Sequence, residues 1–106
     1  MGKLHGMVAL ELGPNLIRVK AICPGFLYTR AWKFFAGRMK DSMPEYKDMA
    51  LRDIFLDVVK RNTPMGREQT LADIGNLMAF LYSDGAANIT GQGIKVDGGI
   101  TLNVMR

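Results

Sequence analysis

The residues of this sequence that best suit a ligand-binding turn are Pro24 and Gly25, which directly follow an apolar, branched stretch at 16–23. Such a stretch, bounded by turn residues on both sides, predicts a strand. In an open α/β sheet, ligands lie beyond the carboxyl ends of the strands, where Gly25 would let the backbone come close and Pro24 would stiffen the turn. The alternative is that Pro24-Gly25 is only a turn that ends the strand.

Histidine and cysteine, common residues of metal sites and of nucleophilic catalysis, each occur once, at His5 and Cys23. No second ligand is spaced with His5, so we predict that it packs on a helix or faces outward and that the chain has no metal site. A single cysteine cannot form an intramolecular disulfide and gives no sign of an oxidising compartment. A cytoplasmic location is therefore the default expectation.

Charge and hydropathy argue against two classes of partner. The sequence has a net charge of +4, but its Lys and Arg residues are scattered among acidic ones and form no cluster that would predict nucleic-acid binding. No apolar run approaches the ~20 residues that span a bilayer, and the start of the sequence lacks the pattern of a secretory signal. We therefore expect a soluble protein that binds neither nucleic acid nor membrane.

The elements that must position Pro24-Gly25 follow from hydrophobic spacing and turn residues. In chain order, the pattern predicts a helix at 4–12, a strand at 16–23, a loop leading into short helices at 26–43, a helix at 44–61, a helix at 70–83 and a strand at 94–97. The helix at 70–83 is expected to begin at a capping box, in which the Thr70 hydroxyl serves the amide of Asp73 and the Asp73 carboxylate reaches back.

Two strands separated by helices predict a right-handed crossover between parallel strands, the unit of an α/β sheet. The composition, with 48% hydrophobic and 23% charged residues, is that of an ordinary globular chain, and no shift in composition divides it. We therefore expect one domain over residues 1–106, part of an open, doubly wound parallel sheet.

Three stretches of the chain, in a fixed order, resemble the C-terminal half of the short-chain dehydrogenase/reductase family. They are Ala9-Leu-Glu-Leu-Gly13 with Ile17-Arg-Val19, Ala21-Ile-Cys-Pro-Gly25 with Thr29, and Ile89-Thr-Gly-Gln92 with Val96-Asp-Gly-Gly99. The match covers nearly the whole chain, and Lys20 departs from the family's usual asparagine. The resemblance implies a partial Rossmann-like fold, two strands with crossover helices, in an NAD(P)-dependent oxidoreductase of an alcohol or carbonyl.

The resemblance also implies where the cofactor and the substrate bind. The positions carried over as contacts of the cofactor, NAD or NADP, are Pro24, Gly25, Leu27 and Thr29. The segment 26–63 corresponds to the helical insertion that covers the substrate in this family, and its Met and aromatic content suits an apolar substrate. Tyr28 and Trp32 are the expected lining residues, with simple packing as the alternative reading of the same composition.

A further set of residues lies where members of this family commonly pack subunits together. The resemblance therefore implies an oligomer interface at Gln92, Asp97, Gly98 and Gly99. The alternative is that these residues only end a strand.

The family's catalytic machinery has no counterpart in these residues. It uses a tyrosine as general acid/base and a lysine four residues later that lowers the tyrosine pKa. Tyr28 with Lys33 and Tyr46 with Lys47 both miss this spacing, and no glycine-rich turn opens a helix to bind pyrophosphate. We therefore assign no catalytic residue and expect the chain to be inactive alone, acting as a homo-oligomer or with a missing N-terminal half. The alternative is a noncatalytic truncated paralogue that serves as an interaction module, because a bared strand edge invites association.

Overall fold

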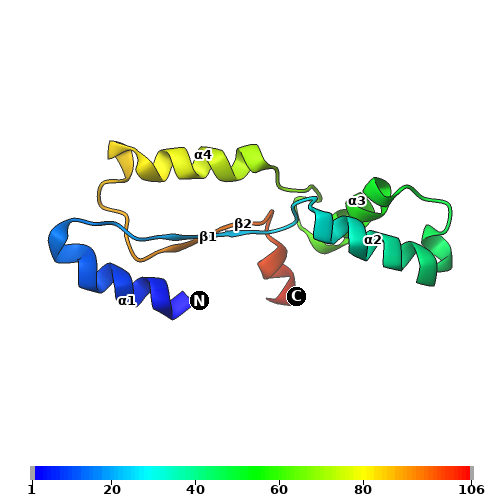
Figure 1. The fold of residues 1–106 in the computed structure, drawn as a ribbon, viewed down its shortest axis with the longest axis horizontal. Coiled ribbons are helices and arrows are strands. Elements are labelled where there is room, and N and C mark those ends of the chain that lie inside the picture. The colour runs from blue at the N-terminus through cyan, green and yellow to red at the C-terminus, as the bar shows by residue number, and fades with distance from the viewer. Residues whose placement is uncertain (1, 106) are drawn as a thin grey trace. The chain divides into compact units, whose positions relative to one another are not determined.

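A computed structural model describes residues 2–105, with side chains described for residues 4–102. Along this part of the chain the helices and strands are α1 (Gly2–Leu12), β1 (Ala21–Pro24), α2 (Arg30–Ser42), α3 (Leu51–Asn62), α4 (Leu71–Tyr82) and β2 (Gly93–Val96) (Figure 1). Short 3₁₀ helices lie at Gly13–Asn15, Pro44–Tyr46, Asp84–Ala86 and Ile100–Met105. Within residues 2–105, no helix combines the length and the apolar character that a membrane-spanning segment needs.

Contacts between residues divide the chain into two compact units. One, here called the sheet unit, contains the residues up to Pro24 together with Leu71–Val96, and therefore holds α1, both strands and α4. The other, here called the helical unit, contains Gly25–Thr70 together with the residues from Asp97 onward, and therefore holds α2 and α3. The predicted single domain over the whole chain remains a prediction.

The sheet unit is built on β1 and β2, which pair in parallel with Ala21 opposite Gly93 and Pro24 opposite Val96. Parallel neighbours cannot be joined by a hairpin, and here the connection contains three helices. Figure 1 shows α1 along one face of this two-stranded sheet and α4 along the other. The predicted α/β class with parallel strands is confirmed.

The first strand is shorter than the sequence predicts, because residues 16–20 do not join the ladder. Leu16 adopts a left-handed conformation with φ of 60°, and its N–H donates to the Gly13 carbonyl at 2.8 Å. The Val19 carbonyl already accepts from the Gly91 N–H at 2.7 Å, but the Val19 N–H donates to the Thr90 hydroxyl at 3.0 Å and not to a backbone carbonyl. The turn after α1 and this side-chain acceptor therefore delay regular pairing until Ala21.

The helical unit has a core of its own where α2 and α3 pack together. Ala36 of α2 and Ile54 of α3 are fully buried, with Tyr46 from the intervening turn almost as deep. The Tyr46 hydroxyl donates a hydrogen bond to the Asp57 carboxylate at 2.7 Å, and this bond, together with burial, raises the tyrosine pKa. Arg61 pairs with the same carboxylate at 3.1 Å.

Two element boundaries in the helical unit differ from the sequence prediction. The segment 26–43, predicted as a loop with short helices, contains the single 13-residue helix α2. The apolar residues of this helix do follow a helical spacing, at Trp32, Phe35, Ala36 and Met39, but the aromatic residues Phe26, Tyr28 and Phe34 lie outside it and hid the period. The helix predicted at 44–61 is instead a 3₁₀ turn followed by α3, because the bonds Tyr46 N–H to Met43 and Met49 N–H to Tyr46 close tight turns.

Candidate functional site

The loop from Gly25 to Thr29, here called the 25–29 loop, is held in the helical unit by Gln69. The Phe26 N–H donates to the side-chain Oε1 of Gln69 at 2.8 Å, and the Gln69 N–H donates to the Phe26 carbonyl at 2.9 Å. Gln69 also donates from Nε2 to the Arg67 carbonyl at 3.2 Å, and it is buried. Both backbone polar groups of Phe26 are thus satisfied by one residue far along the chain.

Position 25 requires a glycine, because neighbouring protein atoms leave no space for a side chain. A Cβ at this position would lie 2.6 Å from Gln69 Oε1 and 2.7 Å from the Asp97 Cα, closer than real Cβ atoms approach such neighbours. Sequence reasoning attributed the missing side chain to the approach of a ligand, but on the side where a Cβ would point the space is already filled. A ligand of this loop must therefore lie on another side of the Gly25 backbone.

Thr29 is the N-cap of α2. Its hydroxyl oxygen accepts a hydrogen bond from the Trp32 N–H at 3.4 Å, and the Thr29 carbonyl accepts from the Lys33 N–H at 3.0 Å. A threonine hydroxyl has one proton to donate besides its acceptor sites. Because capping uses only an acceptor site and Thr29 is exposed, the hydroxyl proton is free to meet an acceptor on a ligand.

Leu27 lies between these two anchored positions and contributes free backbone groups. Within residues 2–105, no hydrogen bond engages its N–H or its carbonyl. A primary carboxamide needs a donor for its oxygen and an acceptor for its NH₂ group. The Thr29 hydroxyl and the Leu27 backbone offer this set of groups, so the residues present fit a carboxamide ligand, whereas Pro24 at the end of β1 has no N–H to offer.

Tyr28 and Trp32, predicted to line a substrate site, belong to an aromatic cluster around the buried Phe55. The ring centroids of Trp32 and Phe55 are 5.2 Å apart, and those of Tyr28 and Phe55 are 4.9 Å apart. Phe26 joins the cluster, with its ring centroid 5.4 Å from that of Trp32. Tyr28 and Trp32 are both half-buried, so packing in the cluster covers part of each side chain and leaves the rest exposed.

A charged pair covers the Tyr28 side of this cluster. The Arg52 guanidinium lies over the Tyr28 ring at 4.9 Å and donates to Glu68 Oε1 at 2.7 Å. The bond to Glu68 raises the Arg52 pKa. The second carboxylate oxygen, Glu68 Oε2, is buried and has no hydrogen-bond partner within the described residues.

The residues predicted as an interface have roles within the chain. The Asp97 carboxylate accepts from the Gly99 N–H at 2.9 Å and from the Thr101 hydroxyl at 3.1 Å, and Asp97 is buried. Gly98 and Gly99 have φ of 61° and 89°, a region that glycine enters without strain. Gln92, in the sheet unit, is exposed and accepts from the Ala21 N–H at 3.0 Å through its carbonyl. Their role between subunits remains a prediction.

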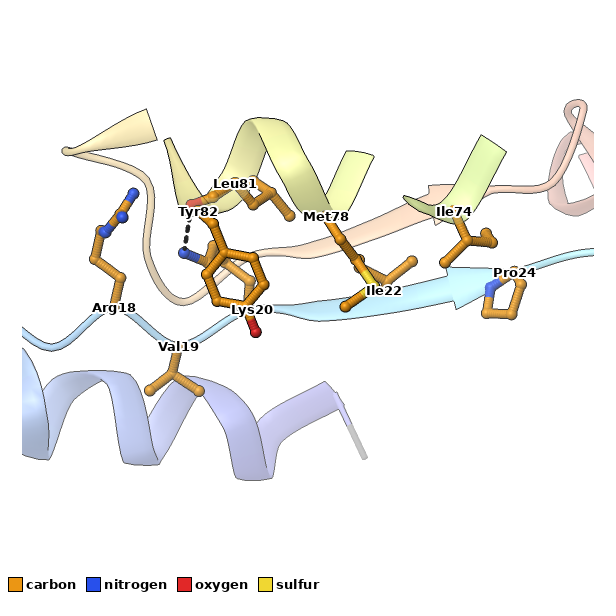
Figure 2. Close-up of a pocket in the computed structure, with 9 residues that line it drawn as sticks. All are labelled: Arg18, Val19, Lys20, Ile22, Pro24, Ile74, Met78, Leu81 and Tyr82. Carbon is orange, nitrogen blue, oxygen red and sulfur yellow. Dashed lines mark hydrogen bonds between the residues drawn. The ribbon is translucent and has the colours of Figure 1, made fainter. Parts of the chain in front are cut away.

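Sequence reasoning missed a groove in the sheet unit between β1 and α4, here called the β1–α4 groove. It has a volume of about 540 Å³. Its lining, shown in Figure 2, consists of Arg18, Val19, Lys20, Ile22, Pro24, Ile74, Met78, Leu81 and Tyr82. Figure 2 shows the two cations near one end, with Met78 and Ile74 toward the other. Partial burial lowers the Lys20 pKa and the nearby Arg18 lowers it further, while the Lys20 ammonium lies 3.5 Å from the Leu81 carbonyl.

Gln69 and Glu68 were not found from the sequence because they lie in a loop with no hydrophobic period, and Arg52 of α3 was not found because the sequence does not indicate its distant partner. Among the described residues, no three His, Cys, Asp or Glu side chains gather as metal ligands would. His5 of α1 instead lies near the sheet, with its Cε1 3.6 Å from where a Cβ of Gly93 would stand.

The known proteins that this chain resembles in sequence are reductases. The sequence model of a family described as enoyl-(acyl carrier protein) reductase matches residues 3–101. A tropinone reductase homologue of Arabidopsis thaliana is 36% identical over 104 residues, which are 97% of this chain and 32% of the relative. The chain thus spans about a third of the length of this relative.

Solved structures agree with the sequence matches. A short chain dehydrogenase family protein from Francisella tularensis superposes with a TM-score of 0.79 at 25% identity, covering 95% of this chain and 40% of that protein. A 4-hydroxyisoleucine dehydrogenase complexed with NADH superposes with a TM-score of 0.69 at 27% identity, covering 95% of this chain and 34% of that protein. The two-stranded parallel sheet and its helices therefore match part of a Rossmann-like fold.

Proposed function

Because the chain belongs to the short-chain dehydrogenase/reductase family, we propose that its 25–29 loop binds the nicotinamide end of NAD or NADP in an oxidoreductase of an alcohol or carbonyl. The observation that carries this proposal is the set of free polar groups on that loop. The Thr29 hydroxyl retains a proton, and the Leu27 backbone is unengaged within the described residues. The related 4-hydroxyisoleucine dehydrogenase was solved with NADH, which supports the same cofactor class here.

When bound, the nicotinamide ring supplies or accepts the hydride of such a reaction. The part of this chain is to orient the ring. In our proposal, the Thr29 hydroxyl donates to the carboxamide oxygen and the Leu27 carbonyl accepts from the carboxamide NH₂ group. Pro24 ends β1 with a restricted φ, and Gly25 begins the loop at a position that has no room for a side chain.

The segment 26–63 is our proposed cover for the substrate. Trp32 shares a hollow on α2 with the apolar residues Phe34, Phe35 and Met39 and with the polar residues Arg38, Asp41 and Ser42. Tyr28 and Trp32 are the proposed lining residues, because each keeps part of its ring free of the aromatic cluster. A lining that combines apolar and polar side chains suits a small alcohol or carbonyl substrate.

We assign no proton donor to this chain, since its 106 residues contain no tyrosine followed four positions later by lysine. We propose that it is inactive by itself and works in association with the rest of such a fold, as part of an oligomer that uses the Gln92 and 97–99 positions. A cytoplasmic location is part of the same proposal and rests on the single cysteine, Cys23.

An NMR titration of the full chain with NADH tests the proposed cofactor loop. We expect weak binding, with a dissociation constant of about 1 mM or weaker, and amide shifts concentrated at Leu27 and Thr29. Thr29→Ser keeps the hydroxyl and should preserve the shifts, whereas Thr29→Val should reduce them. Shifts that are absent from the loop, or that occur only elsewhere, would overturn the proposal.

A second candidate function, a noncatalytic interaction module, is favoured by one observation. Within residues 2–105, β1 pairs only with β2, so its other edge presents unpaired backbone groups next to the β1–α4 groove. An open parallel edge invites another strand. Light scattering after mixing this chain with the full-length tropinone reductase homologue decides the matter: a complex of summed mass supports the module, and two separate species rule it out.

A further inference from the structure

We propose that Gln69 is a positioning residue for the 25–29 loop, holding Phe26 so that Leu27 and Thr29 present their free groups to the nicotinamide in one fixed arrangement. This inference rests on the proposed function for its ligand, but the geometry that supports it involves the protein alone. Gln69 lies outside the loop and would not touch the cofactor itself.

The hydrogen bonds around Gln69 join two backbone segments that are distant in sequence. Its own N–H and its side-chain Oε1 occupy the carbonyl and the N–H of Phe26, at 2.9 and 2.8 Å, so the two residues close a ring of hydrogen bonds. The remaining side-chain donor, Nε2, is taken by the Arg67 carbonyl. A buried side-chain amide with these hydrogen bonds has one low-energy orientation. Because it is fixed, it also fixes the position of the Phe26 backbone.

Two glycines leave room for the Gln69 side chain. A Cβ at Gly25 would lie 2.6 Å from its Oε1, and a Cβ at Gly98 would lie 2.9 Å from its Nε2. The side chain therefore lies against backbone on both sides. The Met65 N–H donates to the Gly98 carbonyl at 3.2 Å, which holds the second of these backbones in place.

A change at Gln69 should alter the geometry of the 25–29 loop without removing a side chain from the helical core. The buried cluster formed by Ala36, Tyr46 and Ile54 does not include Gln69. Loss of the Gln69 side-chain amide removes the acceptor for the Phe26 N–H. It leaves every side chain of that cluster in place. We therefore expect local loosening of the 25–29 loop, with the buried cluster around Ile54 little affected.

Amide hydrogen exchange in the full chain tests the geometric part. In Gln69→Met, a variant of similar length without hydrogen-bonding groups, the Phe26 amide should exchange at least about tenfold faster, while the Ile54 amide, bonded to the Ala50 carbonyl, stays within about twofold. Gln69→Glu keeps an acceptor for Phe26 and should retain most of its protection. If Gln69→Met does not fold, Gln69→Asn, which is one methylene too short to reach, replaces it.

Two exchange results would overturn the proposal. Unchanged protection of Phe26 in Gln69→Met would show that the side chain does not hold the loop. Equal acceleration of Phe26 and Ile54 would show that Gln69 acts only on global stability.

The NADH titration tests the positioning part on the same variants. We expect the dissociation constant measured at Leu27 and Thr29 to rise at least about fivefold in Gln69→Met and to change little in Gln69→Glu. An unchanged affinity in Gln69→Met, with normal binding by the wild-type chain, would overturn the positioning role. Absence of NADH binding by the wild-type chain would instead count against the proposed function, while hydrogen exchange still decides whether Gln69 holds the loop.

Discussion

The helical unit and the sheet unit differ in how far each buries its own apolar residues. In the helical unit, Ile54, Phe55 and Val59 of α3 are completely buried. In the sheet unit, two four-residue strands meet helices whose apolar side chains remain largely in solvent, such as Leu71 at 82% and Met7 at 66% exposure. The unit with the proposed substrate cover therefore supplies its own core, whereas the helices of the sheet unit leave apolar surface that further structure could cover.

The largest expected effect is on the core of the helical unit. Phe55→Ala removes the ring that contacts Tyr28 and Trp32 and should cost about 3–5 kcal/mol of unfolding free energy. The matched change in the sheet unit, Leu81→Ala, should cost about 2 kcal/mol, at the low end for leucine, because Leu81 borders the open β1–α4 groove. Urea unfolding measures both, with Trp32 fluorescence reporting on the helical unit. Equal costs would remove the contrast between the units.

The next effect concerns Gly25. Gly25→Ala places a methyl group within 2.6 Å of Gln69 Oε1 and should destabilise the chain by about 1–3 kcal/mol. Gly37→Ala is the control, because Gly37 lies within α2 with no neighbouring atom within 4 Å of where its Cβ would stand, and alanine is the better helix former by about 1 kcal/mol. Thermal unfolding should therefore move in opposite directions for the two variants. Stabilisation by both would show that the neighbours of Gly25 yield easily.

A smaller effect follows from the buried tyrosine of the helical unit. Tyr46→Phe removes the hydrogen bond to Asp57 and should cost about 1–2 kcal/mol at neutral pH. Since the pKa of Tyr46 is raised above its usual value of 10.0, the bond stabilises the fold fully below about pH 10 and is lost as pH rises through the raised pKa. Denaturation from pH 8 to about pH 11 should show a steeper loss for the wild type than for Tyr46→Phe. Parallel curves would contradict this assignment.

The smallest effect on stability is expected at the exposed apolar surface of the sheet unit. Leu71→Glu at the start of α4 should change the unfolding free energy by no more than about 0.5 kcal/mol, since the side chain is already in solvent. The same change should lower self-association, measured as mass by light scattering over a range of concentrations. Leu56→Glu on α3 is the comparison, and an equal fall there would mean that association does not distinguish the two units.

The parts of the fold that the sequence predicted are those marked by local chemistry. The helix beginning after Thr70 is present as α4, and the Pro24-Gly25 turn does end a strand, because a proline and a glycine act on the backbone wherever they occur. The boundary at 16–20 was wrong, since the delay in pairing depends on the distant Thr90 hydroxyl. Helix α2 was missed because Phe26, Tyr28 and Phe34 add aromatic residues outside its apolar stripe and obscured the helical period.

The residues of the candidate site were proposed from the sequence and remain a prediction, whereas the residue that holds the loop was not proposed. Thr29 and Leu27 follow from the resemblance, and the structure adds that the same threonine begins α2. The role of Gln69 could not be predicted, because the sequence does not indicate which distant backbone amide a polar loop residue will bond. Long-range hydrogen bonds of this kind depend on the tertiary fold and have no periodic signal in the sequence.

The close approach of Asp97 to Gly25 also has a consequence for synthesis of the chain. Contacts between residues so far apart in sequence form slowly, because a long loop must close before they gain anything. On a ribosome, the 25–29 loop emerges before residues 97 and 98, and it lacks part of its packing until they have also emerged. The nascent loop is therefore open to proteases or chaperones until residues 97 and 98 have left the ribosome, and ribosome-bound chains that still hold residue 97 in the exit tunnel should be cleaved there more readily than released chains.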